Sequence, residues 1–111
     1  MNRTGPFLLA AFLFVAAAAL EVAGDAVIRV GLRGRSGWII VLGALMLAAY
    51  GVVVNLIPWD FSRLLGTYIA VFAVVAILVG RFHFGDSVPL STWLGLALIV
   101  LGAAVIQLGS R

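Results

Sequence analysis

Cysteine and lysine are absent from this chain of 111 residues, which has only four acidic side chains and one histidine. The lack of cysteine excludes a disulfide framework and thiol catalysis. The single histidine, His83, has no histidine or cysteine partners with which to bind a metal, so we expect no metal site and no cofactor. The sequence also has no nucleophile–base pair and no glycine-rich phosphate loop, so we do not expect an enzyme.

Apolar side chains dominate the composition. Hydrophobic residues make up 65% of the chain, charged residues 10%, and the mean hydropathy is +1.27. A soluble domain of this length has too little interior to bury so much apolar surface, so we expect most of the chain to lie in lipid. The positive charges are all arginine, with a net charge of +3. In a membrane protein we interpret them as anchors to phosphate headgroups, and we expect no nucleic acid partner.

Four apolar segments are separated by short polar connections, and each has about the 17 to 25 residues that a spanning helix needs. They cover approximately residues 7–30, 38–57, 64–84 and 89–109. Backbone polar groups in lipid must be satisfied within the segment, so each should be a helix. Because the connections are short, consecutive helices should be antiparallel. The sequence thus predicts an all-α membrane protein, a four-transmembrane-helix bundle forming a single domain over residues 1–111.

The first apolar segment has a second interpretation, as a signal peptide. "MNR" followed by "FLLAAFLFVAAAAL" has the charged and apolar parts of such a peptide, and Ala17 and Ala19 offer a cleavage site. The apolar pattern resumes after Glu21, however, which favours a spanning helix.

Two carboxylates, Glu21 and Asp25, interrupt the first apolar segment in "AAALEVAGDAVIRVG". On a helix they lie about 40° apart, on one stripe with the small residues Ala17 and Gly24. Small residues let another helix or a ligand approach the backbone closely. Ionisable groups inside a membrane are costly and usually functional. We predict that the deeper acid, Glu21, exchanges a proton and attracts a cation; the alternative is a protonated, hydrogen-bonded core residue.

Asp25 has two interpretations that the sequence leaves open. Arg29 follows it by four residues, a spacing at which the two side chains of a helix can form an ion pair near the membrane surface. Alternatively, Asp25 joins Glu21 in binding protons and substrate.

Three motifs, in order along the chain, resemble one family of membrane transporters. "LEVAGDAVIR" resembles an A-E-x-x-G…(K/R) segment, with Glu21 and Gly24 on its glutamate and glycine. "FSRLLGTY" resembles F-x-R-x-Y-x-x-Y, with Arg63 and Tyr68 matching and Leu65 in place of the first tyrosine. The fourth segment resembles G-x-x-L-I-x-x-G at Gly95, Leu98, Ile99 and Gly102. Together these motifs resemble the small multidrug resistance superfamily of the bacterial inner membrane, and its YnfA-like branch.

This resemblance implies proton-coupled export of small organic cations by an antiparallel, dual-topology homodimer. Glu21, Asp25 and Tyr68 would bind the proton and the substrate. Ala17, Gly24 and Arg63 would line the cavity. The fourth segment would pack at the dimer seam through the residues of its motif, namely Gly95, Leu98, Ile99 and Gly102. The expected partners are a second copy, a small cation, protons and the bilayer.

Several alternatives remain beside this prediction. The glycines of the fourth segment can pack within one bundle, and Tyr68 can be a core residue. Arg63 can anchor to headgroups, or it can pair with Asp60 or with a carboxylate of the pore. The arginines divide almost evenly between the two sides, so a dual or a fixed orientation fits the charge pattern equally. Two other functions are a non-transporting membrane subunit and translocation of a lipid-linked sugar, the latter with phosphate bound by Arg29, Arg33 and Arg35.

Overall fold

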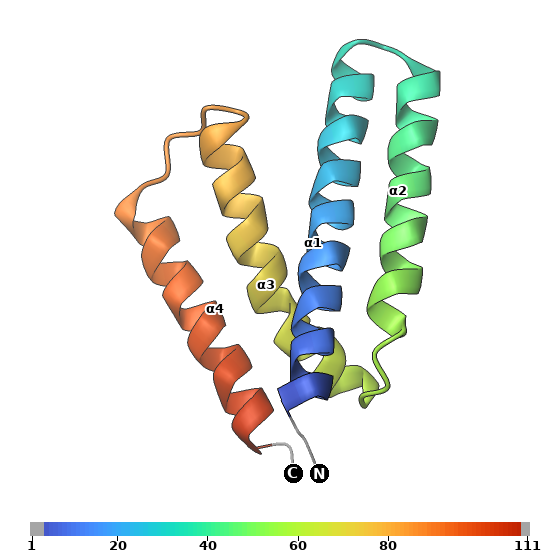
Figure 1. The fold of residues 1–111 in the computed structure, drawn as a ribbon. Coiled ribbons are helices and arrows are strands. Elements are labelled where there is room, and N and C mark those ends of the chain that lie inside the picture. The colour runs from blue at the N-terminus through green and yellow to red at the C-terminus, as the bar shows by residue number, and fades with distance from the viewer. Residues whose placement is uncertain (1–3, 110–111) are drawn as a thin grey trace. The chain divides into compact units, whose positions relative to one another are not determined.

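The computed structural model describes the backbone of residues 4–109 and the side chains of residues 7–109. It contains four α-helices and, among the described residues, no strand. The helices are α1 (Thr4–Arg33), α2 (Gly37–Asn55), α3 (Phe61–Phe82) and α4 (Leu90–Gly109) (Figure 1). Each is long and apolar enough to cross a membrane. The predicted all-α class with four candidate spans is confirmed.

The helices do not begin and end where hydropathy alone placed the spans. Helix α1 continues through Arg33, three residues beyond the predicted end, and α3 begins at Phe61, three residues before the predicted start. The first turn of α3 is closed by the Leu64 N–H, which donates to the Asp60 carbonyl oxygen at 2.8 Å. Polar residues at membrane surfaces can still be helical, because backbone hydrogen bonding and not polarity sets the helix end.

The chain divides into two compact units, Met1–Pro58 and Trp59–Arg111. Each unit is a hairpin of two helices, α1 with α2 and α3 with α4. In the first hairpin Ser36 caps α2, because its hydroxyl oxygen accepts a hydrogen bond from the Ile39 N–H at 3.4 Å. Pro58 follows the last turn of α2 and cannot continue a helix.

Glycines set the distance between α1 and α2, which run side by side in Figure 1. A Cβ placed on Gly24 would lie 3.0 Å from the Gly43 carbonyl oxygen, and a Cβ on Gly43 would lie 2.8 Å from the Gly24 carbonyl oxygen. Gly31 in turn lies against Ile40. As the residue number rises on one helix it falls on the other, so the two helices are antiparallel, and their backbones nearly touch at small residues.

The second hairpin is also antiparallel. At one end Gly66 of α3 lies against Ile106 of α4, and at the other end Gly80 lies against Asp86 of the connecting segment. The connection turns at Gly85, whose φ of +70° suits glycine. Most of α4 is exposed within the structure, and Ala103 is its only buried residue among those described.

Candidate functional site

Glu21 lies beside the midpoint of the candidate span Phe7–Arg33. Its side chain is half-buried, between the fully buried Ala17 and the buried Gly24. Gly24 contacts α2, so Glu21 lies next to the closest approach of the two helices. The structure thus brings together three of the predicted site residues, Glu21, Ala17 and Gly24.

Tyr50 of α2 is a neighbour of Glu21 that was not predicted from the sequence. The two side chains interact electrostatically. The contacts of Gly24 with Leu47 and of Gly31 with Ile40 define a register that places Tyr50 opposite Glu21. A signal was present, because Tyr50 is the only titratable side chain in the second apolar segment. Recognising it required the helix pairing, which the glycine spacing of the two segments could have supplied.

The other carboxylate of α1, Asp25, is exposed, as is Arg29. The predicted stripe of Ala17, Glu21, Gly24 and Asp25 is therefore divided. Gly24 contacts α2 and Glu21 interacts with Tyr50 of α2, whereas Asp25 lies at the flank and is exposed, because each residue turns the helix by about 100°. The suggested ion pair between Asp25 and Arg29 stays a prediction.

Arg63 belongs to a polar cluster at one end of the α3–α4 hairpin. Its Nε donates a hydrogen bond to Gln107 Oε1 at 3.2 Å, and the Thr67 hydroxyl donates to the same oxygen at 3.5 Å. The guanidinium carbon lies 4.1 Å from the centre of the Trp59 ring, a cation–π distance. Gln107 was not among the residues predicted for the site, although its amide among the apolar residues of the last span was an available signal. These contacts hold Arg63 in place within its own hairpin.

Tyr68, the predicted aromatic of the site, is buried, with 4% of its surface exposed. Its ring centre lies 6.4 Å from that of Phe72, one turn further along α3. Tyr68 and Glu21 belong to different units of the chain. The assignment of Tyr68 to the binding site therefore stays a prediction.

The motif residues of α4 lie on a face that α3 does not cover. Nothing lies within 4 Å of a Cβ placed on Gly95 or on Gly102. Leu98 is 70% exposed and Ile99 39%. Among the described residues no group of three or more histidine, cysteine or acidic side chains is arranged to hold a metal ion.

Sequence comparison places these features in a known family. Residues 7–111 match the family described as "Uncharacterised BCR, YnfA/UPF0060 family". The chain belongs to the YnfA/UPF0060 family. This family is part of the small multidrug resistance-like superfamily, so the resemblance inferred from the sequence motifs is confirmed.

Relatives of this YnfA-family chain are similar over most of their length. A UPF0060 membrane protein of Synechocystis sp. is 30% identical over 99 residues, covering 88% of this chain and 92% of the relative. One from Herpetosiphon aurantiacus is 35% identical over 100 residues, with 87% and 91% covered. One from Frankia casuarinae is 38% identical over 101 residues, with 89% and 92% covered. No solved structure matches the chain.

These relatives are bacterial membrane proteins by name, and the YnfA-family chain has four candidate transmembrane helices. It is a multi-pass bacterial membrane protein. The predicted membrane location is confirmed.

Proposed function

We propose that this YnfA-family protein exports small organic cations in exchange for protons, with Glu21 as the shared binding site. The observation that carries the proposal is a half-buried carboxylate beside the midpoint of a spanning helix. An ionised carboxylate at this depth is costly unless a positive charge neutralises it. Either a proton or a cationic substrate can do so. Because the proton and the cation would compete for Glu21, the movement of one across the membrane would be coupled to the movement of the other.

Tyr50 supports this role of Glu21 because it supplies two further interactions beside the carboxylate. A phenolic hydroxyl can donate a hydrogen bond to an ionised carboxylate. The face of the aromatic ring attracts organic cations. A site made of Glu21 and Tyr50 therefore has the chemistry to bind an organic cation and to release it when Glu21 takes up a proton.

Two surfaces support the homodimer that this mechanism uses. The face of α4 that carries Gly95 and Gly102 is open, and small residues on such a face allow close helix packing in lipid. Asp25 is exposed only four residues from Glu21, at a depth where contact with lipid alone is unfavourable for a carboxylate. A second copy of the chain would cover both the open face of α4 and the Asp25 side chain. The almost even division of the arginines fits two copies inserted in opposite directions.

Transport in proteoliposomes with an imposed pH gradient tests the proposal. We expect the wild-type protein to accumulate guanidinium or tetramethylammonium on the acidic side, and Glu21→Gln to reduce this to the level of protein-free vesicles. Asp60→Asn is the control, because it neutralises an exposed carboxylate that lies outside the four helices. We expect it to retain transport. Equal fluxes for the wild type and Glu21→Gln would contradict the proposal.

A second candidate function is a non-transporting subunit of a larger membrane complex. The exposed apolar face of α4 favours this second function, because a different protein could cover the face in place of a second copy of the chain. In that case no cation would be transported by the purified protein, and one defined partner would co-purify in fixed proportion.

A further inference from the structure

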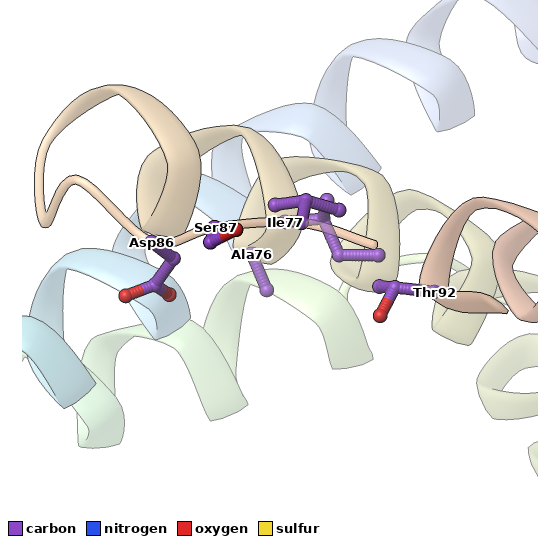
Figure 2. A pocket seen from close by; sticks show the side chains of 6 residues that line it. Ala76, Ile77, Asp86, Ser87 and Thr92 are labelled. Atoms are coloured by element: carbon purple, nitrogen blue, oxygen red, sulfur yellow. The ribbon is translucent and has the colours of Figure 1, made fainter. Parts of the chain in front are cut away.

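A groove lies where the segment between α3 and α4 folds back against the end of α3. It has a volume of about 380 Å³. Figure 2 shows it from close by. Three lining side chains are polar and three apolar: Asp86, Ser87, Thr92, Ala76, Ile77 and Val88. All of them belong to the second unit of the chain, so the groove is built within one hairpin.

The main chain fixes the position of the acidic residue in this groove. The Asp86 N–H donates a hydrogen bond to the Gly80 carbonyl oxygen at 2.9 Å. A Cβ on Gly80 would lie only 2.6 Å from Asp86 Oδ2. The carboxylate therefore lies against the bare backbone of α3, in space that any side chain at position 80 would occupy.

The lining groups define which ligand the groove suits. The Asp86 carboxylate and the Ser87 hydroxyl oxygen can accept hydrogen bonds from an ammonium group, while Ala76, Ile77 and Val88 provide an apolar wall for attached carbon atoms. A calcium ion takes about six to eight oxygen ligands, whereas this groove offers one carboxylate and two hydroxyl groups. Asp86 is the only charged lining residue, so an anion would be repelled.

The positive groups that adjoin Asp86 in the sequence do not line the groove. The guanidinium carbon of Arg81 lies 5.7 Å from the centre of the Phe82 ring, and neither Arg81 nor His83 is a lining residue. Asp86 also lies outside the helices, between the end of α3 at Phe82 and the start of α4 at Leu90. We therefore expect Asp86 to lie at the depth of the lipid headgroups, and Ala76 and Ile77, which belong to α3, to lie deeper.

We infer that this groove is a second cation site, separate from Glu21, which binds a primary ammonium group on a short carbon chain. Two sources carry this group: the ethanolamine headgroup of a phospholipid, and a free amine in solution. Both would place the ammonium against Asp86 and Ser87, and the attached carbon chain would extend along the groove toward Thr92, which lies at the other end (Figure 2). The site does not depend on the function proposed for Glu21.

Solution NMR of the full chain in nanodiscs tests this site, with ethanolamine as the probe. In bilayers of phosphatidylglycerol alone, we expect the amide signals of Ser87 and Thr92 to shift and saturate as ethanolamine is added. Asp86→Asn should weaken binding at least tenfold. Gly80→Ala keeps the charge but displaces the carboxylate, and should weaken binding as well. Asp60→Asn, which neutralises the other exposed aspartate flanking α3, is the matched control and should bind as the wild type does.

A second bilayer separates the two sources of the ammonium group. If phosphatidylethanolamine shifts the same signals and leaves free ethanolamine without further effect, the lipid headgroup occupies the groove. If the signals still respond to free ethanolamine, the site serves soluble amines. Shifts that do not saturate in phosphatidylglycerol, or equal shifts in Asp86→Asn, would overturn the inference. The titration is repeated in Glu21→Gln, the variant expected to lose transport. The groove of this variant should bind ethanolamine as the wild type does, so the result does not depend on transport.

Discussion

Glu21 lies beside the midpoint of a helix whose other side chains nearby, apart from Asp25, are small or apolar. The surroundings of a carboxylate, and not its residue type alone, determine whether it is suited to exchange a proton for a cation. Asp25, four residues later, is exposed, while Glu21 has Tyr50 opposite it on α2. Two acids on one helix are thus placed in different surroundings, and the one next to a phenol in the helix interface has the better site for exchanging a proton with a cation.

Removal of the Tyr50 hydroxyl should weaken cation binding at Glu21. We expect Tyr50→Phe to lower the affinity for tetramethylammonium about tenfold, since a hydrogen bond to a charged group contributes roughly 1.5–3 kcal/mol. Isothermal titration in detergent measures this change. In the Glu21→Gln background Tyr50→Phe should have no further effect, because both side chains act on the same bound cation. Additive losses from the two substitutions would contradict a shared site.

At the residue scale the sequence predicted single side chains better than pairs. Glu21 could be identified because a carboxylate in an apolar run is conspicuous by itself. Tyr50 and Gln107 could not, because their importance depends on which residue lies opposite on another helix. That depends on the register of each hairpin, which tight glycine contacts determine. Asp25 was grouped with Glu21 by helical angle alone, whereas the structure places it outside the α1–α2 contact.

The first hairpin depends on close contact at Gly43, and this makes a prediction about stability. A Cβ on Gly43 would lie 2.5 Å from Ile28 Cγ1 and 2.8 Å from the Gly24 carbonyl oxygen. The backbone oxygen cannot move aside cheaply, so we expect Gly43→Ala to destabilise the protein by about 1–3 kcal/mol. Thermal unfolding in detergent, followed by circular dichroism, measures the change.

Gly51 of the same helix provides the matched control for Gly43. Nothing lies within 4 Å of a Cβ at this position. Gly51→Ala should therefore be neutral or stabilising by up to about 1 kcal/mol, because alanine is the better helix former. Equal stability of Gly43→Ala and Gly51→Ala would contradict the close contact between α1 and α2 at Gly43.

The helices themselves were largely predictable, because lipid leaves few alternatives for an apolar run of this length. The ends were less so. Arg33 and Ser62 look like loop residues by polarity, yet both are helical. The backbone hydrogen bonds that close each terminal turn depend on local geometry, to which hydropathy is insensitive.

At the scale of the whole molecule, α4 should join two copies of the chain. Gly102 is open and next to the exposed Leu98 on the same face. We expect Gly102→Leu to shift the protein from dimers to monomers in liposomes, measured by single-molecule photobleaching, without unfolding the hairpin. Ala104→Leu is the control, because Ala104 is exposed on a different side of α4. Dimers that persist in Gly102→Leu would place the seam elsewhere.

Association of this kind was harder to predict from the sequence than the spans were. An apolar face such as that of Leu98 and Val105, both 70% exposed, suits lipid as well as protein. Hydropathy does not distinguish the two environments, because the interior of a bilayer is as apolar as the interior of a protein. Only the small residues on that face indicate a contact with another helix.

The central claim is that one carboxyl group binds either a proton or a cation. The most direct measurement is the carboxyl ¹³C signal of Glu21 in lipid bilayers, recorded as tetramethylammonium is added at constant pH. The signal should move from the protonated to the ionised position in step with cation binding, and acidification should displace the cation and reverse the shift. A cation that binds while the Glu21 signal stays unchanged, or that binds equally at every pH, would contradict it.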